Sequence, residues 1–262
     1  MTEHRMTHGP AGESIHVTVD GHGPAILFLA GTGQDSSDWH RAGYVARLCG
    51  NYRVIAIDLP GQGRSRGSTD AADYYLAPML AILETVANDL GLSGFALLGY
   101  SSGGVLALQA AAHLPRVPVV IAMGTTSARP VDAEMAVRAA SQARRVHQAK
   151  SDGSLESLSL TPAQLRTAVR MDIPAHIAAL HGQATWPLLD LRQLRCPGLL
   201  YLSPDDAAAA TDLLASLCDA PGSTPRGRLL AHVEPGLDHD SVFEQSQRAL
   251  NRIEPFLAGS TW

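Results

Sequence analysis

Short apolar runs recur along the chain, each followed by a turn and then by a helical pattern, and this alternation constrains the fold most strongly. It predicts βαβ units, because a helix that crosses over between two strands leaves those strands parallel. The middle runs are apolar at successive positions, as expected for strands that helices cover on both faces. The expected strands are Ile15–Val19, Ala25–Leu29, Val54–Asp58, Phe95–Leu98, Val119–Ala122, Leu199–Leu202 and Leu229–Val233.

Helical patterns fill most of the gaps between these runs. The pattern over Ser102–Leu114 is apolar on almost every face, which predicts a helix buried against the sheet. Residues 125–196 carry helical patterns but no convincing strand, so we expect them to form an inserted helical cap. The expected core is then residues 1–124 and 197–262, an α/β fold with a mostly parallel central sheet and helices on both faces. The other expected helices are Trp39–Leu48, Tyr75–Leu90, Ala207–Leu217 and Val242–Leu257.

The composition is typical of a globular protein that binds neither nucleic acid nor a membrane. Hydrophobic residues make up 45% of the chain and charged residues 17%, a balance that can bury a sizeable core. The formal net charge of −5 contains no long run of one sign, which argues against both nucleic acid and an anionic membrane as partners. Residues 1–14 lack the apolar core of a secretory signal, and no apolar run of membrane-spanning length follows. We therefore expect a cytoplasmic protein whose partner is a small-molecule substrate, with its oligomeric state left open.

The cysteines and the N-terminal histidines give no sign of a disulfide or a metal site. Cys49, Cys196 and Cys218 are far apart and odd in number, so we expect three buried thiols. His4 and His8 lie in a polar segment that we expect to be a mobile tail with solvated side chains. The sequence thus predicts no metal and no organic cofactor.

One turn carries the clearest sign of chemistry. The buried run Phe95–Leu98 leads directly into Gly99-Tyr100-Ser101-Ser102-Gly103-Gly104 and then into a helix. Glycines two residues before and two residues after the central serine permit a very tight turn, because their missing Cβ atoms avoid clashes. Such a turn lifts Ser101 Oγ clear of the sheet and points the amides of the helix N-terminus toward it. This G-x-S-x-G pattern predicts that Ser101 is a nucleophile in acyl chemistry.

Over nearly its whole length the chain resembles the α/β-hydrolase superfamily of Ser-His-Asp enzymes. Leu29-Ala30-Gly31-Thr32-Gly33 is similar to that family's oxyanion loop, although Ala30 stands where histidine is usual. The resemblance implies that the backbone amides of Thr32 and Ser102 hold an oxyanion. The segment Asp58–Ser65 is similar to the family's D-x-x-G-x-G-x-S pattern, whose role there is structural.

A serine hydroxyl needs a base to take its proton and a carboxylate to orient that base. The resemblance implies the chain order Ser, then Asp or Glu, then His. Of the eleven histidines, only His239 follows the last predicted strand, so it is the expected base. The preceding predicted strand, Leu199–Leu202, leads into Ser203-Pro204-Asp205-Asp206. This segment resembles the family's G-x-x-D pattern with Ser203 where glycine is usual, and the resemblance implies that Asp206 is the acid. Asp205 is the alternative acid, and Asp132, after the preceding strand, is a third candidate.

These residues predict a serine hydrolase that cleaves a small ester, lactone or thioester through an acyl-enzyme on Ser101. A C–C bond hydrolase, a haloperoxidase-like enzyme and a biosynthetic cyclase or lyase on the same triad are alternatives. A non-catalytic small-molecule receptor of the same fold is another. Serine at position 101 argues against the epoxide hydrolase and haloalkane dehalogenase branches, which need a carboxylate nucleophile. The expected substrate-contacting residues are Gly31, Gly33, Tyr100 and Trp186.

The expected cap is more basic than the rest of the chain. It carries nine Lys or Arg residues against six Asp or Glu, a formal charge of +3. These charges either form ordinary solvated helix faces, the favoured interpretation, or attract an anionic substrate. Its apolar residues either line a pocket above the core or form the cap's own core. They are Leu155, Leu158, Leu160, Met171, Ile173, Ile177, Leu180 and Trp186.

Overall fold

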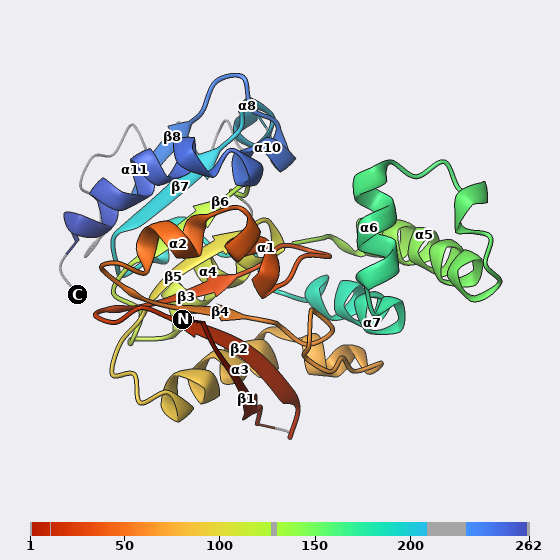
Figure 1. Cartoon of the computed structure of the whole chain (residues 1–262), viewed down its shortest axis with the longest axis horizontal. Coiled ribbons are helices and arrows are strands. Elements are labelled where there is room, and N and C mark those ends of the chain that lie inside the picture. Colours follow the sequence, from red (N-terminus) through yellow and green to blue (C-terminus); the bar gives the residue numbers. More distant parts are fainter. Residues whose placement is uncertain (1, 11, 127–129, 209–228, 261–262) are drawn as a thin grey trace.

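The computed structural model describes residues 2–10, 12–126, 130–208 and 229–260 (Figure 1). Their centre is an eight-stranded sheet with the order β1-β2-β4-β3-β5-β6-β7-β8. All seven expected strands are present. The strands are β1 (Glu3–His8), β2 (Ser14–Asp20), β3 (Ala25–Leu29), β4 (Arg53–Ile57), β5 (Ala96–Tyr100), β6 (Val120–Met123), β7 (Gly198–Leu202) and β8 (Leu229–Val233).

The sheet is parallel from β4 through β3, β5, β6 and β7 to β8, and only β2 runs antiparallel to its neighbours β1 and β4. The central strands are buried along their whole length, as their apolar sequences predict. Leu98 of β5 lies between Phe28 of β3 and Ile121 of β6, so the register stacks apolar side chains across the sheet. The expected mostly parallel α/β fold is confirmed.

Helices cover both faces of this sheet. Successive strand residues point to opposite faces, so Leu27 and Leu29 belong to one core cluster, whereas Ile26 and Phe28 belong to the other. The first cluster packs against α3 (Leu76–Asp89) and α4 (Ser102–His113). The second packs against α1 (Ser36–Arg41), α2 (Tyr44–Leu48), α10 (His239–Glu244) and α11 (Ser246–Ala258). A short 3-10 helix, η1 (Ala71–Tyr74), precedes α3.

Two helices that the sequence predicts as continuous are interrupted. Trp39–Leu48 divides into α1 and α2 at Gly43, whose φ of 87° ends the helical path. Val242–Leu257 divides into α10 and α11 at Gln245. Of the expected helix Ala207–Leu217, only the first two residues lie in the described ranges, within α8 (Pro204–Ala208).

The N-terminal segment forms a strand, so the expectation of a mobile tail is wrong. β1 pairs with β2 from Glu3 opposite Val19 to His8 opposite Ser14. A polar sequence suits this place because β1 is an edge strand, with only one side paired and most side chains exposed. Cys196 is buried, and burial raises the pKa of its thiol to about 11. Cys49 is only partly buried, contrary to expectation, and Cys218 lies outside the described residues.

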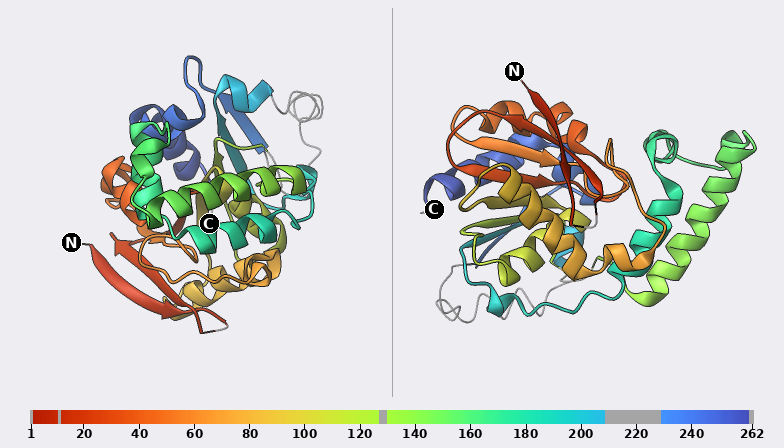
Figure 2. Two further views of the ribbon diagram at one scale, coloured as in Figure 1. Left: turned by 90° about the vertical axis from the view of Figure 1, so that its right-hand side faces the viewer. Right: turned by 90° about the horizontal axis from the view of Figure 1, so that it is seen from below.

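The connection between β6 and β7 projects from the sheet as a group of helices (Figure 2). Its described residues form helices and no strand, as expected for residues 125–196. α5 packs on α7 through a small cluster centred on Ala136, Ala140 and Leu180. Its helices are α5 (Ala133–Ser151), η2 (Leu155–Ser157), α6 (Pro162–Arg170), α7 (Ile173–Gln183) and η3 (Leu191–Gln193). No helix in the described ranges has both the length and the apolar character needed to cross a bilayer.

Candidate active site

The chemically important residues follow three parallel strands at the point where each strand ends. Ser101 follows β5, Asp206 lies in the helix after β7, and His239 begins the helix after β8. The carboxyl ends of parallel strands meet at one edge of a sheet, so segments far apart in sequence converge there.

Ser101 lies in a strained turn between β5 and α4. Its φ of 53° and ψ of −121° are unusual for a residue with a side chain, and it is the one non-glycine with a positive φ among the described residues. The backbone is held by hydrogen bonds from the Ser101 amide to the Met123 carbonyl (2.8 Å) and from the Val105 amide to the Ser101 carbonyl (3.0 Å). A Cβ on Gly103 would lie 2.2 Å from the Leu29 carbonyl oxygen, so α4 approaches β3 this closely only with glycine there.

Ser101, His239 and Asp206 form a continuous hydrogen-bonded chain. His239 Nε2 lies 3.1 Å from Ser101 Oγ, and His239 Nδ1 lies 2.9 Å from Asp206 Oδ1. The second carboxylate oxygen of Asp206 accepts hydrogen bonds from the Ser203 amide (3.1 Å) and hydroxyl (2.8 Å). Asp205, the alternative acid, is exposed. Of the two adjacent carboxylates, Asp206 is therefore the one that contacts the histidine.

The pKa values in this chain shift in opposite directions. The hydrogen bond that His239 donates to the Asp206 carboxylate raises the pKa of His239 above its ordinary value of 6.5, although partial burial opposes that shift. Partial burial favours the neutral acid at Asp206, but the hydrogen bonds from His239 and Ser203 outweigh it and lower the pKa of that carboxyl. The Tyr100 hydroxyl donates to the His239 carbonyl oxygen at 2.9 Å and so fixes the backbone of the loop that carries the imidazole.

The other carboxylates near this chain have different contacts. Asp132 caps the N-terminus of α5 by accepting a hydrogen bond from the Met135 amide at 2.7 Å. Asp238 caps α10 in the same way through the Ser241 amide at 2.8 Å. Both side chains therefore cap helices, and Asp206 is the carboxylate that contacts the imidazole of His239.

The two residues expected to hold an oxyanion lie side by side. The Thr32 hydroxyl donates to Ser102 Oγ at 3.0 Å, which joins the loop after β3 to the start of α4. Within the described part of the chain, neither the Thr32 amide nor the Ser102 amide donates to a protein acceptor. Both amides can therefore donate to a developing negative charge, and the Ser102 amide also lies at the N-terminus of α4, which favours an anion.

A cavity of about 860 Å³ contains Ser101 and His239 and extends between the core and helices α5, α6 and α7. Gly33 and Tyr100 line it, as expected, and Gly31 lies against Tyr100 and Ser101. This volume suits a small organic molecule.

The structure places Trp186 elsewhere. Its indole is 2% exposed, donates to the Tyr74 carbonyl oxygen at 2.9 Å, and lines a separate cavity of about 60 Å³ beside Thr32 and Ser102. Of the apolar residues expected around a pocket, Leu160, Met171 and Ile173 line the larger cavity. Ile177 and Leu180 belong instead to the small core between α5 and α7.

His176, which no sequence pattern places at the site, lines both cavities. Among the described residues, no group bonds to its ring. Burial lowers the pKa of this imidazole, so it is neutral at neutral pH. The surrounding helical pattern gives no sign of this position, because which face of α7 meets a cavity depends on how the helix docks.

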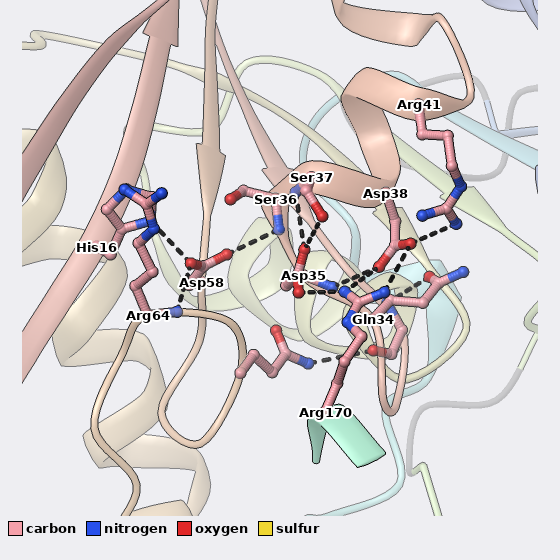
Figure 3. A network of polar contacts seen from close by, with 12 residues as sticks. His16, Gln34, Asp35, Ser36, Ser37, Asp38, Arg41, Asp58, Arg64 and Arg170 are labelled. Carbon is pink, nitrogen blue, oxygen red and sulfur yellow. Dashed lines mark hydrogen bonds and ion pairs between the residues drawn. The ribbon is translucent and has the colours of Figure 1, made fainter. Parts of the chain in front are cut away.

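A polar network supports the loop after β3 (Figure 3). Asp58 Oδ1 accepts from the Ser36 amide at 2.7 Å, and Asp58 Oδ2 accepts from the Arg64 amide at 2.9 Å. The same carboxylate lies 2.8 Å from Nδ1 of the buried His16. Asp58 thus joins β2, the start of α1 and the loop after β4. These contacts fit the structural role that the resemblance implies for its segment.

Comparison with known proteins gives relatives of several activities. A magnesium-chelatase 30 kDa subunit of Rhodobacter capsulatus is 36% identical over 113 residues, 43% of this chain and 38% of that protein. A pimeloyl-[acyl-carrier protein] methyl ester esterase of Xanthomonas oryzae is 38% identical over 104 residues, 39% of this chain and 37% of the esterase. The chain thus matches less than two fifths of the length of these curated relatives.

Solved structures are similar in fold across nearly the whole chain. The enol-lactonase from Burkholderia xenovorans has a TM-score of 0.76 at 22% identity, covering 97% of this chain and all of the lactonase chain. A thermophilic esterase from Thermogutta terrifontis has a TM-score of 0.72 at 22% identity, with 98% of each chain covered. Residues 26–253 match the family described as the alpha/beta hydrolase family. The sheet order, the turn at Ser101 and this match agree, and the chain belongs to the alpha/beta hydrolase family.

Proposed function

We propose that this protein is a serine hydrolase that cleaves a small ester, lactone or thioester through an acyl-enzyme on Ser101. The hydrogen-bonded chain from Ser101 through His239 to Asp206 carries the proposal, because His239 lies within hydrogen-bond reach both of the hydroxyl that it deprotonates and of the carboxylate that orients it. The relatives named as esterase and lactonase support a hydrolytic reaction of this class.

In the proposed mechanism, Ser101 Oγ attacks the substrate carbonyl carbon while its proton passes to His239 Nε2. Asp206 keeps the other ring nitrogen protonated and stabilises the imidazolium that forms. The amides of Thr32 and Ser102 donate to the oxyanion. The imidazolium then protonates the leaving group, and the carbon–heteroatom bond breaks to leave an ester on Ser101.

A water molecule completes the cycle. It attacks the acyl carbon as its proton passes to His239, and the second tetrahedral intermediate collapses with return of that proton to Ser101 Oγ. The free acid then leaves through the large cavity. We propose that the helices of residues 125–196 act as a cap whose inner face selects the substrate, since α5, α6 and α7 supply much of the cavity wall.

Labelling with a fluorophosphonate probe tests the proposal. Intact-mass analysis of the wild-type protein is expected to show one added phosphonyl group, which Ser101→Ala loses. Ser157→Ala serves as the control, since it removes an exposed serine hydroxyl that lies outside the site and should leave the labelling unchanged. An unlabelled wild-type protein that binds small esters without turning them over would favour a receptor and overturn the proposal.

The reaction products separate the acyl mechanism from the other reactions of this fold. Mass detection on a panel of esters, lactones and thioesters is expected to yield carboxylic acids. Each ester or thioester should release an equal amount of alcohol or thiol, and each lactone should give a single hydroxy acid. Epoxide hydrolysis is disfavoured because Ser101 provides no carboxylate nucleophile, although an epoxide hydrolase of Caballeronia sordidicola is 36% identical over 104 residues.

A further inference from the structure

The loop from Gly31 to Asp35 has to hold the Thr32 amide at a fixed position, but few of its own contacts do so. The Gln34 amide donates to the Gly31 carbonyl at 3.1 Å, and Gln34 Oε1 accepts from the Gly31 amide at 3.3 Å. From outside the loop, Gln62 Nε2 donates to the Gly31 carbonyl at 3.1 Å. These bonds secure the first residue of the loop and leave its later residues to other partners.

The C-terminal end of α6 covers the later residues of this loop. A Cβ on Gly33 would lie 2.4 Å from Thr167 Cγ2 and 3.1 Å from Met171 Cε, so the helix end touches the loop backbone directly. Arg170 lies between these two residues in sequence, and its side chain extends toward α1 and pairs with Asp35 and Asp38 (Figure 3). A helix of the connection between β6 and β7 therefore holds the loop that follows β3.

The arginine meets a pair of carboxylates that are already part of the local structure. Asp35 is the N-cap of α1, and Asp38 Oδ2 accepts the Asp35 amide at 2.9 Å to complete a capping box. Arg170 Nη2 lies 3.0 Å from the same Asp38 oxygen. The Asp38 carboxylate thus links the Arg170 guanidinium to the backbone amide of Asp35.

The two carboxylates of this contact are largely buried, unlike those of a typical surface ion pair. The side chains of Asp38 and Asp35 are 2% and 14% exposed, whereas that of Arg170 is 39% exposed. Partial burial opposes ionisation of Asp35, but hydrogen bonds from Ser37 and Arg170 lower its pKa. Removing the guanidinium would leave two poorly hydrated carboxylates close together, with Arg41 as the remaining cation on Asp38.

We propose that Arg170 is a positioning residue: by clamping Asp35 and Asp38 it fixes the loop that presents the Thr32 amide to the oxyanion. This inference rests on the proposed function. It also connects the cavity wall to the reaction centre, because the oxyanion site is complete only when α6 is docked on the loop. Thr32 lies within the same turn as Gln34 and is joined to Ser102, so a shift of the loop displaces one oxyanion donor from the other.

Steady-state kinetics of Arg170→Gln with p-nitrophenyl acetate test the clamp. We expect kcat to fall by about 10- to 100-fold, less than or similar to the loss of a whole oxyanion donor, while KM changes less than about threefold. Inhibition by a boronic acid, which forms a tetrahedral adduct on serine, should weaken in parallel with kcat/KM. Arg138→Gln is the matched control, since it removes an exposed arginine that pairs with Glu134 on α5. It should leave kcat, KM and the boronic acid inhibition constant unchanged.

A second variant guards against simple misfolding. Asp35→Asn keeps an N-cap acceptor and the side-chain shape but loses the charge that Arg170 binds, so it should lower kcat in the same way. The variant that combines Arg170→Gln with Asp35→Asn should have the same kcat as Arg170→Gln alone, because both changes break the same interaction. Losses that multiply in the double variant, or an effect of Arg170→Gln confined to KM, would overturn the clamp.

The outcomes separate this inference from the proposed function. If fluorophosphonate does not label the wild-type protein, the proposed function fails and the clamp fails with it. If labelling at Ser101 succeeds and Arg170→Gln turns over substrate at the wild-type kcat with unchanged boronic acid affinity, only the clamp is wrong.

Discussion

The turn at Ser101 and the helices between β6 and β7 form two sides of one cavity, but they are held by different means. β5 is buried along its whole length and α4 along most of it, within two large core clusters. α5 buries only alanines, namely Ala136, Ala140, Ala143 and Ala149. Large apolar side chains such as Val137 remain exposed on it. Small side chains remove little apolar surface from water, so packing holds α5 only weakly.

This difference separates the chemistry from access to it. A reaction centre that needs contacts accurate to fractions of an ångström lies where close packing prevents movement. The opposite wall includes α5, which packs on α7 mainly through alanines and can therefore adjust its position. We therefore expect substitutions around Ser101 to change kcat or folding, and substitutions on α5 and α7 to change substrate binding.

The largest expected effect is on the acid that orients His239. Asp206→Asn should lower kcat by about ten-thousandfold, because the asparagine amide favours the wrong imidazole tautomer. Asp205→Asn, one residue away and exposed, is the control and should be nearly silent. Measured kcat values with the reverse pattern would move the acid to Asp205.

The next effect is on folding at the turn. Gly103→Ala would place a Cβ 2.2 Å from the Leu29 carbonyl oxygen and should cost about 3 kcal/mol of unfolding free energy. Gly50→Ala, which meets nothing within 4 Å, is the control. Urea denaturation of the two variants measures the difference, and equal midpoints would contradict the rigid packing assigned to the turn.

The pH dependence of activity tests the imidazole. The base must be neutral, and its pKa is raised above 6.5 by Asp206, so kcat/KM should fall about tenfold per pH unit below a midpoint above 6.5. The same raised pKa means that the folded state binds this proton more tightly than the unfolded state. That increment of stability is present below about 6.5 and is lost as pH rises through the folded-state pKa. Asp206→Asn should move the activity midpoint downward; an unchanged midpoint would assign it to another group.

A smaller loss of stability, confined to the contact between α5 and α7, is expected from a change inside that contact. Ala140→Leu introduces bulk at a fully buried position between α5 and α7 and should destabilise their contact by about 1 kcal/mol. Hydrogen exchange should accelerate in α5 but not in β5. Val137→Leu, on the exposed face of the same helix, is the control. Slower folding or faster exchange in the sheet would show that the two sides are not independent.

The smallest effect is on substrate contact at His176. His176→Phe removes the hydrogen-bonding ring from the cavity wall and should change KM by about threefold with kcat nearly constant. His181→Phe on the same helix should change neither constant. A loss confined to kcat would place His176 in the chemistry instead.

Much of the fold was predictable because its signals are local. Apolar runs of strand length and the glycine spacing around Ser101 act over a few residues, and both specify backbone conformation directly. Other elements were missed for physical reasons. β1 is a polar edge strand that carries no apolar run, and the positive φ of Gly43 that divides one helix is a conformation that glycine permits but does not require.

By itself the sequence determined the parallel α/β core, the turn that exposes Ser101 and the order in which Asp206 and His239 follow it. Those features depend on local backbone preference and on the burial of apolar runs. Only the tertiary structure decided that Asp206 rather than Asp205 contacts the imidazole, because one turn of α8 sets which carboxylate faces inward. It alone brought Arg170 to Asp35 across 135 residues, since a contact that distant arises when two separately formed surfaces dock.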